Sequence, residues 1–221
     1  MTKSVKSTSI IGEAEGPTSI FITGQKEKNI FKRLRTIYIN KKYRFKRRLA
    51  AKSIVPNPHT IDEVIEYIKQ RYDACEADES YPHFKERKRG MKMALIQRKR
   101  PELLGGEKHF APPADLNDIQ VVKDWQRQID DWFNDCQRKT DLISNETFPT
   151  DYHLFIIRKG DQGTLEVETE TVHSVLSISW SGSRKVMNAI SKDIYLYYGV
   201  SQKDIDKQSE RYKSLLTCLC S

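Results

Sequence analysis

One alternating stretch of the sequence decides the fold: YHLFIIRKGDQGTLEVETETVHSVLSISW, residues 152–180. Apolar and polar side chains alternate along much of it, as they do in half-buried β-strands. The alternation predicts three antiparallel strands at 152–158, 164–172 and 173–180. The residues between the first two strands, 159–163, contain two glycines and are expected to turn the first hairpin.

The two faces of this expected sheet differ in polarity. Leu165 and Val167 alternate with three glutamates, Glu166, Glu168 and Glu170, which predicts that one face of the strand is solvated. A row of carboxylates on a solvated strand is typical of a soluble surface and is only a weak indication of acid–base catalysis. In the third strand, Leu176, Ile178 and Trp180 are expected to face inward, and Ser177 and Ser179 outward.

Helical patterns flank the strands in the chain. Thr60 and Glu63 have the spacing of a capping box, and so do Ser201 and Asp204. Apolar stripes of helical period predict helices at 26–52, from Thr60 to about Cys75, at about 82–99 and 117–140, from the 181–185 stretch to Gly199, and from Ser201 onward. The last two stripes lead us to expect Tyr197 and Leu219 on inward faces, and the fourth Ile119 and Trp125. The predicted class is α+β, a small antiparallel sheet of about three to four strands packed with about six helices.

Composition divides the chain into four segments. They are an N-terminal motif segment (1–25), a basic amphipathic helix (26–52), a mainly helical region (53–145), and a hairpin, strand and two C-terminal helices (150–221). We expect 53–145 and 150–221 to form one compact domain. No apolar run of about 18 residues is present, and 1–25 lacks the pattern of a secretory signal, so a cytoplasmic protein without a transmembrane segment is expected.

Positive charge is concentrated in two segments. Residues 26–52 hold twelve Lys or Arg against one Glu, a charge of +11, and residues 85–100 hold eight against one, a charge of +7. Because the whole chain carries only +8, the remaining residues carry −10. An acidic body with two basic segments indicates a surface that meets an anionic partner.

The first basic segment also carries an apolar stripe. Its members are Ile30, Leu34, Ile37, Tyr38, Phe45 and Leu49. In one interpretation the stripe docks on the core and the charges only solvate the outer face. In the leading one the cations bind phosphates and the aromatic rings stack on bases of RNA or DNA. An anionic membrane surface or an acidic protein is a further possible partner. The expected nucleic-acid contacts are Lys32, Arg33, Arg35, Lys41, Lys42, Arg44, Lys46, Arg47, Arg48, Tyr38, Tyr43, Arg87, Lys88 and Arg89.

A second candidate site lies at the expected strand-to-helix junction. It consists of Ser181, Gly182, Ser183, Arg184 and Lys185. Backbone N–H groups at a helix N-terminus attract anions, so this stretch could bind a phosphate in a nucleotide-binding enzyme or sensor. A plain turn followed by an N-cap serine explains the same residues.

The sequence favours a binding protein over an enzyme. No Gly-x-Ser-x-Gly stretch is present, the five histidines are scattered, and the four cysteines lack Cys-x-x-Cys spacing. Neither nucleophilic catalysis, a metal site nor a cofactor is expected. The stretch Cys218-Leu219-Cys220-Ser221 matches a four-residue prenylation box, which is a weak signal because the pattern is so short.

The N-terminal segment contains the stretch IIGEAEGPTSI, residues 10–20. It resembles a motif of the β subunit of sodium-translocating decarboxylases, with Gly12, Gly16, Pro17 and Thr18 matching and Glu15 in place of an acidic residue implicated in sodium handling. This resemblance implies a cation at Glu15, but the carboxylate could also simply balance the lysines that follow. The pump's membrane helices have no counterpart here, so pumping is not expected.

The whole chain resembles a group of small soluble bacterial proteins. They share the N-terminal motif, an NPHT stretch (57–60) and a KDIYLYYGVS stretch (192–201). This second resemblance implies a family and no particular activity.

Overall fold

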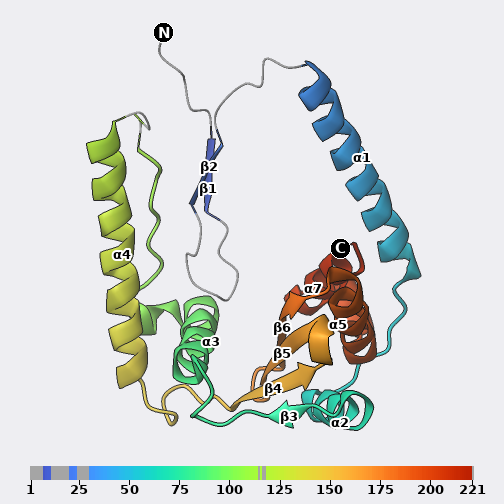
Figure 1. The fold of residues 1–221 in the computed structure, drawn as a ribbon. Coiled ribbons are helices and arrows are strands. Elements are labelled where there is room, and N and C mark those ends of the chain that lie inside the picture. Colours follow the sequence, from blue (N-terminus) through green and yellow to red (C-terminus); the bar gives the residue numbers. More distant parts are fainter. Residues whose placement is uncertain (1–6, 11–19, 24–29, 114, 116–117, 221) are drawn as a thin grey trace. The chain divides into compact units, whose positions relative to one another are not determined.

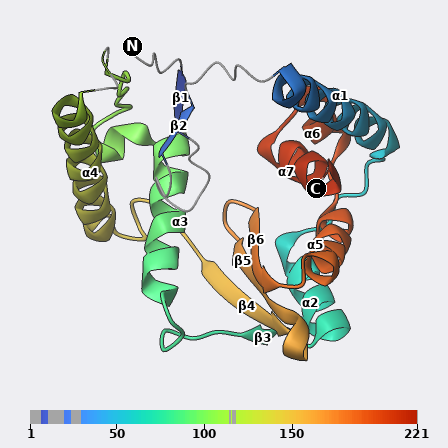
Figure 2. The same cartoon turned by 45° about the horizontal axis from the view of Figure 1, so that its top comes forward.

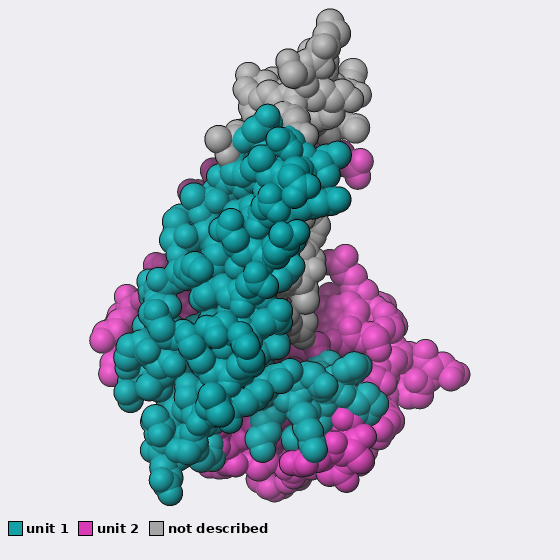
Figure 3. Space-filling model, turned by 90° about the vertical axis from the view of Figure 1, so that its left-hand side faces the viewer, with its two compact units in different colours: residues 1–28, 82–149 teal, residues 29–81, 150–221 magenta. Residues whose placement is uncertain are grey.

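The computed structural model describes residues 7–10, 20–23, 30–113, 115 and 118–220 (Figure 1). The chain forms two compact units, coloured separately in Figure 3. Unit 1 comprises residues 1–28 and 82–149, and unit 2 comprises 29–81 and 150–221. The described residues contain seven α-helices, a four-stranded antiparallel sheet and a two-stranded one, which confirms the predicted α+β class. Residues of the 53–145 region contribute to both units.

Unit 1 is built mainly from two helices. They are α3 (Phe84–Lys99) and α4 (Ile119–Leu142), with a short 3₁₀-helix at Pro101–Leu104. The strands β1 (Ser7–Ile10) and β2 (Ile20–Thr23) pair in antiparallel register. Asp118 caps α4, because its Oδ1 accepts hydrogen bonds from the backbone N–H groups of Gln120 (2.9 Å) and Val121 (3.3 Å).

The predicted apolar stripes of α3 and α4 are largely buried. Met91 and Leu95 in α3 and Trp125, Ile129 and Cys136 in α4 are all buried. Ile119 does not follow the prediction, because it lies in the first turn of α4 and is 71% exposed.

The sheet of unit 2 has the strand order β3-β4-β5-β6. These strands are β3 (Cys75–Glu76), β4 (Tyr152–Arg158), β5 (Gly163–Glu170) and β6 (Val175–Gly182). The sequence did not predict β3. Helix α2 (Ile61–Tyr72) is followed by Asp73, which adopts a left-handed φ of 55° and ends the helix. The chain then pairs with β4, so Cys75 lies in a strand and not in the predicted helix. Its side chain is exposed.

Two helices cover one face of this sheet. Helices α2 and α5 (Arg184–Tyr198) contribute Val64, Ile68, Met187 and Ile194 to a core shared with Phe155, Leu165, Val167 and Leu176 of the strands. Each fully buried aliphatic side chain of this kind contributes about 1.5–3 kcal/mol through burial alone. Trp180 does not face inward as predicted, because it lies near the end of β6 and is 37% exposed. Ser177 and Ser179 are half-buried.

Both predicted capping boxes are confirmed, at Thr60–Glu63 and Ser201–Asp204. The last predicted helix is divided into α6 (Gln202–Lys207) and α7 (Glu210–Cys220), since Gln208 adopts a left-handed φ of 48°. Helix α1 (Ile30–Ser53) lies beside α7 (Figure 2). Within the described part of the chain, no helix is both long and apolar enough to cross a bilayer.

Candidate functional site

Helix α1 presents a basic surface. It contains ten Lys or Arg residues and no acidic residue. Every side chain from Arg35 to Leu49 is exposed. This stretch holds nine of the expected contacts: Arg35, Tyr38, Lys41, Lys42, Tyr43, Arg44, Lys46, Arg47 and Arg48. Lys32 and Arg33 lie in the same helix, but their side chains fall outside the described part of the structure.

The apolar stripe of α1 is exposed as well. Ile37, Tyr38, Phe45 and Leu49 are 49%, 66%, 63% and 53% exposed. The interpretation in which this stripe docks on the core is therefore wrong for residues 37–49. The reason lies in how the helix is attached.

Helix α1 is held to the rest of unit 2 through its C-terminal end. Ala50 and Ala51, followed by Ile54, pack against a cluster that includes Leu215 and Leu216 of α7. At about 100° per residue, the two alanines project from the side of α1 roughly opposite to the centre of the apolar stripe. The stripe therefore points away from the cluster that anchors the helix.

The exposed cations of α1 are not neutralised within the protein. None of those from Arg35 to Arg48 forms an ion pair with another described residue. An external anion could bind them without first breaking an internal ion pair. Because like charges repel one another at this density, such an anion would also relieve an unfavourable interaction.

The second basic segment is more committed to internal contacts. In α3, Nη1 of Arg89 lies 3.2 Å from Oδ2 of Asp141, and both Arg87 and Arg89 are half-buried. Of the three expected contacts, only Lys88 is exposed. Nζ of Lys92 donates to the Ile143 carbonyl. Burial lowers the pKa of Lys92, opposed by Asp141 and reinforced by Lys88. This segment belongs to unit 1, whereas α1 belongs to unit 2.

All five residues of the junction at 181–185 are exposed. Gly182 has a φ of 109°, and a Cβ there would meet the Gln162 carbonyl oxygen at 2.4 Å, so the turn itself requires this glycine. Ser183 precedes α5 but makes no side-chain capping bond, and its N–H donates to the Gln162 carbonyl (2.8 Å). Arg184 and Lys185 are exposed, but nothing in the structure tests whether they bind an anion, so the anion site stays a prediction.

The expected solvated face of β5 is wrong. Glu168 is 6% exposed and Glu170 is fully buried. The carboxylates tolerate burial because each accepts hydrogen bonds: Glu166 from Tyr81 (2.8 Å) and Ser179 (3.1 Å), and Glu168 from Tyr152 (3.1 Å). Sequence alternation could not reveal these donors, since most of them come from other elements.

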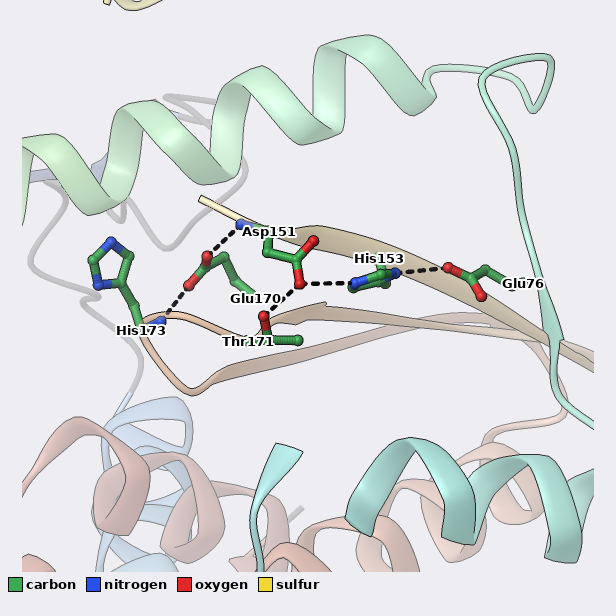
Figure 4. Close-up of polar contacts among 6 residues, drawn as sticks. All are labelled: Glu76, Asp151, His153, Glu170, Thr171 and His173. Atoms are coloured by element: carbon green, nitrogen blue, oxygen red, sulfur yellow. Dashed lines mark hydrogen bonds and ion pairs between the residues drawn. The ribbon is translucent and has the colours of Figure 1, made fainter. Parts of the chain in front are cut away.

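Glu170 belongs to a network at one end of the sheet (Figure 4). Its two carboxylate oxygens accept the backbone N–H groups of Asp151 (2.8 Å) and His173 (2.6 Å). The Thr171 hydroxyl donates to Oδ2 of Asp151 (2.6 Å). The carboxylate thus closes the turn between β5 and β6 onto the start of β4.

His153 lies between two carboxylates in the same network (Figure 4). Its Nδ1 is 2.7 Å from Oε1 of Glu76, and its Nε2 is 3.2 Å from Oδ2 of Asp151. Burial acts to lower the pKa of His153, but the hydrogen bonds to Glu76 and Asp151 outweigh it and the pKa is raised. Because both ring nitrogens contact carboxylates, His153 links β3 to the start of β4 and has no nitrogen free to act as a general base.

This geometry makes stability depend on pH. Because the folded pKa of His153 is raised above about 6.5, its contribution is fully present below pH 6.5 and is lost as the pH rises through the folded pKa. We expect His153→Gln to remove up to about 1 kcal/mol of unfolding free energy at pH 6 and much less at pH 9, measured by urea unfolding. His109→Gln, at an exposed position, is the control. An equal loss at both pH values would contradict the prediction.

Among the described residues, the possible metal ligands do not cluster, and three of the four cysteines are buried or half-buried. Across the described residues, no group of three His, Cys, Asp or Glu side chains is placed to hold a metal ion. Cys136 and Cys220 are buried. Burial raises the pKa of Cys218 to about 11, opposed by Lys192, so this thiol is protonated at neutral pH.

The NPHT and KDIYLYYGVS stretches meet in space. The N–H of Asn57 donates to the Val200 carbonyl, and the N–H of His59 to the Tyr198 carbonyl, both at 3.0 Å. The His59 ring stacks on Tyr197 with a centroid distance of 4.2 Å. Nothing in the sequence indicated this pairing. The two stretches form a structural junction that joins α2 to α5.

A second junction between these helices lies beside it. Oδ2 of Asp193 accepts hydrogen bonds from the hydroxyls of Tyr67 and Tyr72 (2.6 Å for Tyr72) and from Nε of Arg71 (3.1 Å). An open pocket of about 370 Å³ adjoins Tyr67. It is lined by Asp62, Glu63, Glu66, Tyr67, Gln70 and Tyr197. Tyr67 and Tyr197 stack on each other at 3.9 Å, so their facing surfaces are occupied.

The N-terminal motif residues Gly12, Glu15, Gly16, Pro17 and Thr18 lie outside the described residues. Comparisons of the chain with protein-family models, with curated proteins and with solved structures found no match. The exposed surface of α1 is therefore the feature that points to a function.

Proposed function

We propose that the protein binds RNA or DNA through the phosphate backbone, using α1. The observation that carries this proposal is an exposed helix with ten cations, no acidic residue, and no ion pair to another described residue from Arg35 to Arg48. Cations that neutralise phosphates release condensed counterions, which is the main source of sequence-independent affinity for nucleic acids. This ligand is consistent with the cytoplasmic location expected from the sequence.

The length of α1 favours a polymer over a small anion. A helix of 24 residues extends about 36 Å, and its cations are distributed along that length. A small phosphorylated molecule would contact only a few of them at once. Outside the two basic segments the chain carries −10, so those residues would repel a polyanion. Of the two basic segments, α1 is the one whose exposed cations are not committed to internal contacts.

An anionic membrane surface or an acidic protein is the second candidate partner. The exposure of Ile37 and Leu49 favours it, since aliphatic side chains beside cations suit an interfacial helix. Vesicles of phosphatidylglycerol therefore serve as a competing ligand in every binding experiment.

The proposal is tested with Arg47→Ala combined with Arg48→Ala. Each lost phosphate contact flattens the dependence of log affinity on log salt concentration by about one unit, so the pair should weaken binding roughly 10-fold at about 0.1 M salt. The measurement is fluorescence anisotropy of a labelled oligonucleotide at several salt concentrations.

The matched control is Lys203→Ala combined with Lys207→Ala. These exposed residues of α6 lie in the same unit, and their removal changes the net charge equally. Similar losses for both pairs would indicate a net-charge effect and count against α1. Absent or salt-insensitive binding of the unaltered protein would contradict nucleic-acid binding altogether.

A further inference from the structure

The exposed stripe of α1 carries two aromatic rings on one side of the helix. Resting on the proposed function, we infer that the nucleic acid is single-stranded and that Tyr38 and Phe45 stack on its bases. The two rings are 66% and 63% exposed. Neither has a ring contact or hydrogen bond to another described residue. Both are therefore available to an external ligand.

The spacing of the two rings suits a strand that runs along the helix. They are seven residues apart, which places them about 10 Å apart along the axis and within about 20° of the same direction. Lys41 projects from the same side between them, and Arg48 follows within one turn of Phe45. Rings interleaved with cations let bases stack while the neighbouring phosphates are neutralised.

A duplex does not suit this surface. Its base faces are already stacked, and its grooves are read by side chains that hydrogen-bond to base edges. The stripe offers mainly Ile37, Tyr38, Phe45 and Leu49, of which only the tyrosine has a hydrogen-bonding group. Only a single strand exposes base faces to such a surface.

Tyr43 belongs to the other side of the helix. It is 43% exposed and projects close to the direction of Ala50, which packs on the α7 cluster. The inference therefore assigns stacking to Tyr38 and Phe45 and withdraws Tyr43 from the contacts expected from the sequence. This gives a control residue of the same chemical type on the same helix.

The experiment compares a labelled oligo(dT) of about 20 nucleotides with a duplex of equal length at about 0.1 M salt. The unaltered protein should bind the single strand at least 10-fold more tightly. Tyr38→Leu combined with Phe45→Leu should weaken single-strand binding roughly 10- to 100-fold and duplex binding less than about 2-fold. Leucine keeps the stripe apolar, so a loss reports on ring stacking.

Tyr43→Leu is expected to leave both affinities within about 2-fold of those of the unaltered protein. Equal affinity for the two ligands, or an unaltered preference in the double variant, would overturn the single-strand inference. Salt-sensitive binding of both ligands would still support the proposed function in that case. Binding to phosphatidylglycerol vesicles without oligonucleotide binding would overturn both.

Discussion

Gly199→Ala is expected to lower the free energy of unfolding by roughly 3–5 kcal/mol. Gly199 follows α5 with φ 60° and ψ −164°, a region that residues with a Cβ rarely occupy. A Cβ there would lie 1.8 Å from the Asn57 carbonyl oxygen, which is backbone and cannot move aside alone. Relief would require separating the paired segments 57–59 and 198–200.

Arg211 makes this separation still more costly. Its guanidinium donates to the carbonyls of Gly199 (2.7 Å), His59 (2.8 Å) and Tyr198, and lies over the Tyr198 ring at 3.6 Å. Moving one segment away would break part of this charge-assisted set. Thermal and urea unfolding of the variant are the measurements.

The control is Gly160→Ala in the same unit. Gly160 also has a positive φ, 55°, but a Cβ there meets no atom within 4 Å. Only the backbone strain remains, so a loss of roughly 1 kcal/mol is expected. If both alanine variants lost the same stability, the close approach to Asn57 would not be the cause.

Glu170→Ala is expected to cost roughly 3 kcal/mol of unfolding free energy. The fully buried carboxylate accepts the N–H groups of Asp151 and His173, and alanine provides no acceptor for either. Glu170→Gln should lose about half as much, since its amide oxygen can accept one N–H while its NH₂ faces the other. Urea denaturation at pH 7 measures both variants.

An exposed glutamate in the same unit serves as the control for this pair. Glu66→Gln on α2 should change stability by less than about 0.5 kcal/mol. If Glu170→Gln were equally silent, the carboxylate could not be the acceptor that holds this turn closed.

Local features of the fold were predictable because they depend on short-range rules. The capping boxes at Thr60 and Ser201 follow from residue spacing, and the hairpin at 159–163 from its glycines and the alternation around it. Strand β3 was not predictable, because two residues carry no periodicity and pair only once β4 is in place. The break between α6 and α7 at Gln208 was not predictable either, because the left-handed residue there is not a glycine.

For the candidate site on α1, the sequence predicted the basic composition but not the exposure of the apolar stripe. The basic stretch is visible in the sequence, but an amphipathic helix has the same pattern whether it is docked or free. Its exposure depends on Ala50 and Ala51, through which the helix attaches. The burial of Glu168 and Glu170 was not predictable either, because alternating glutamates are typical of a solvated strand face. Their hydrogen-bond donors, a tyrosine hydroxyl and two backbone N–H groups, lie outside β5 and come close only in the folded chain.

The attachment of α1 by one end has a consequence for the helix itself. Residues 35–49 gain little from packing, while Lys42 with Lys46 and Arg44 with Arg48 stand four residues apart, where like charges repel across a helical turn. The order of this helix thus depends on the ionic surroundings. A polyanion lying along it would neutralise these repulsions, so ligand binding and helix formation would reinforce each other.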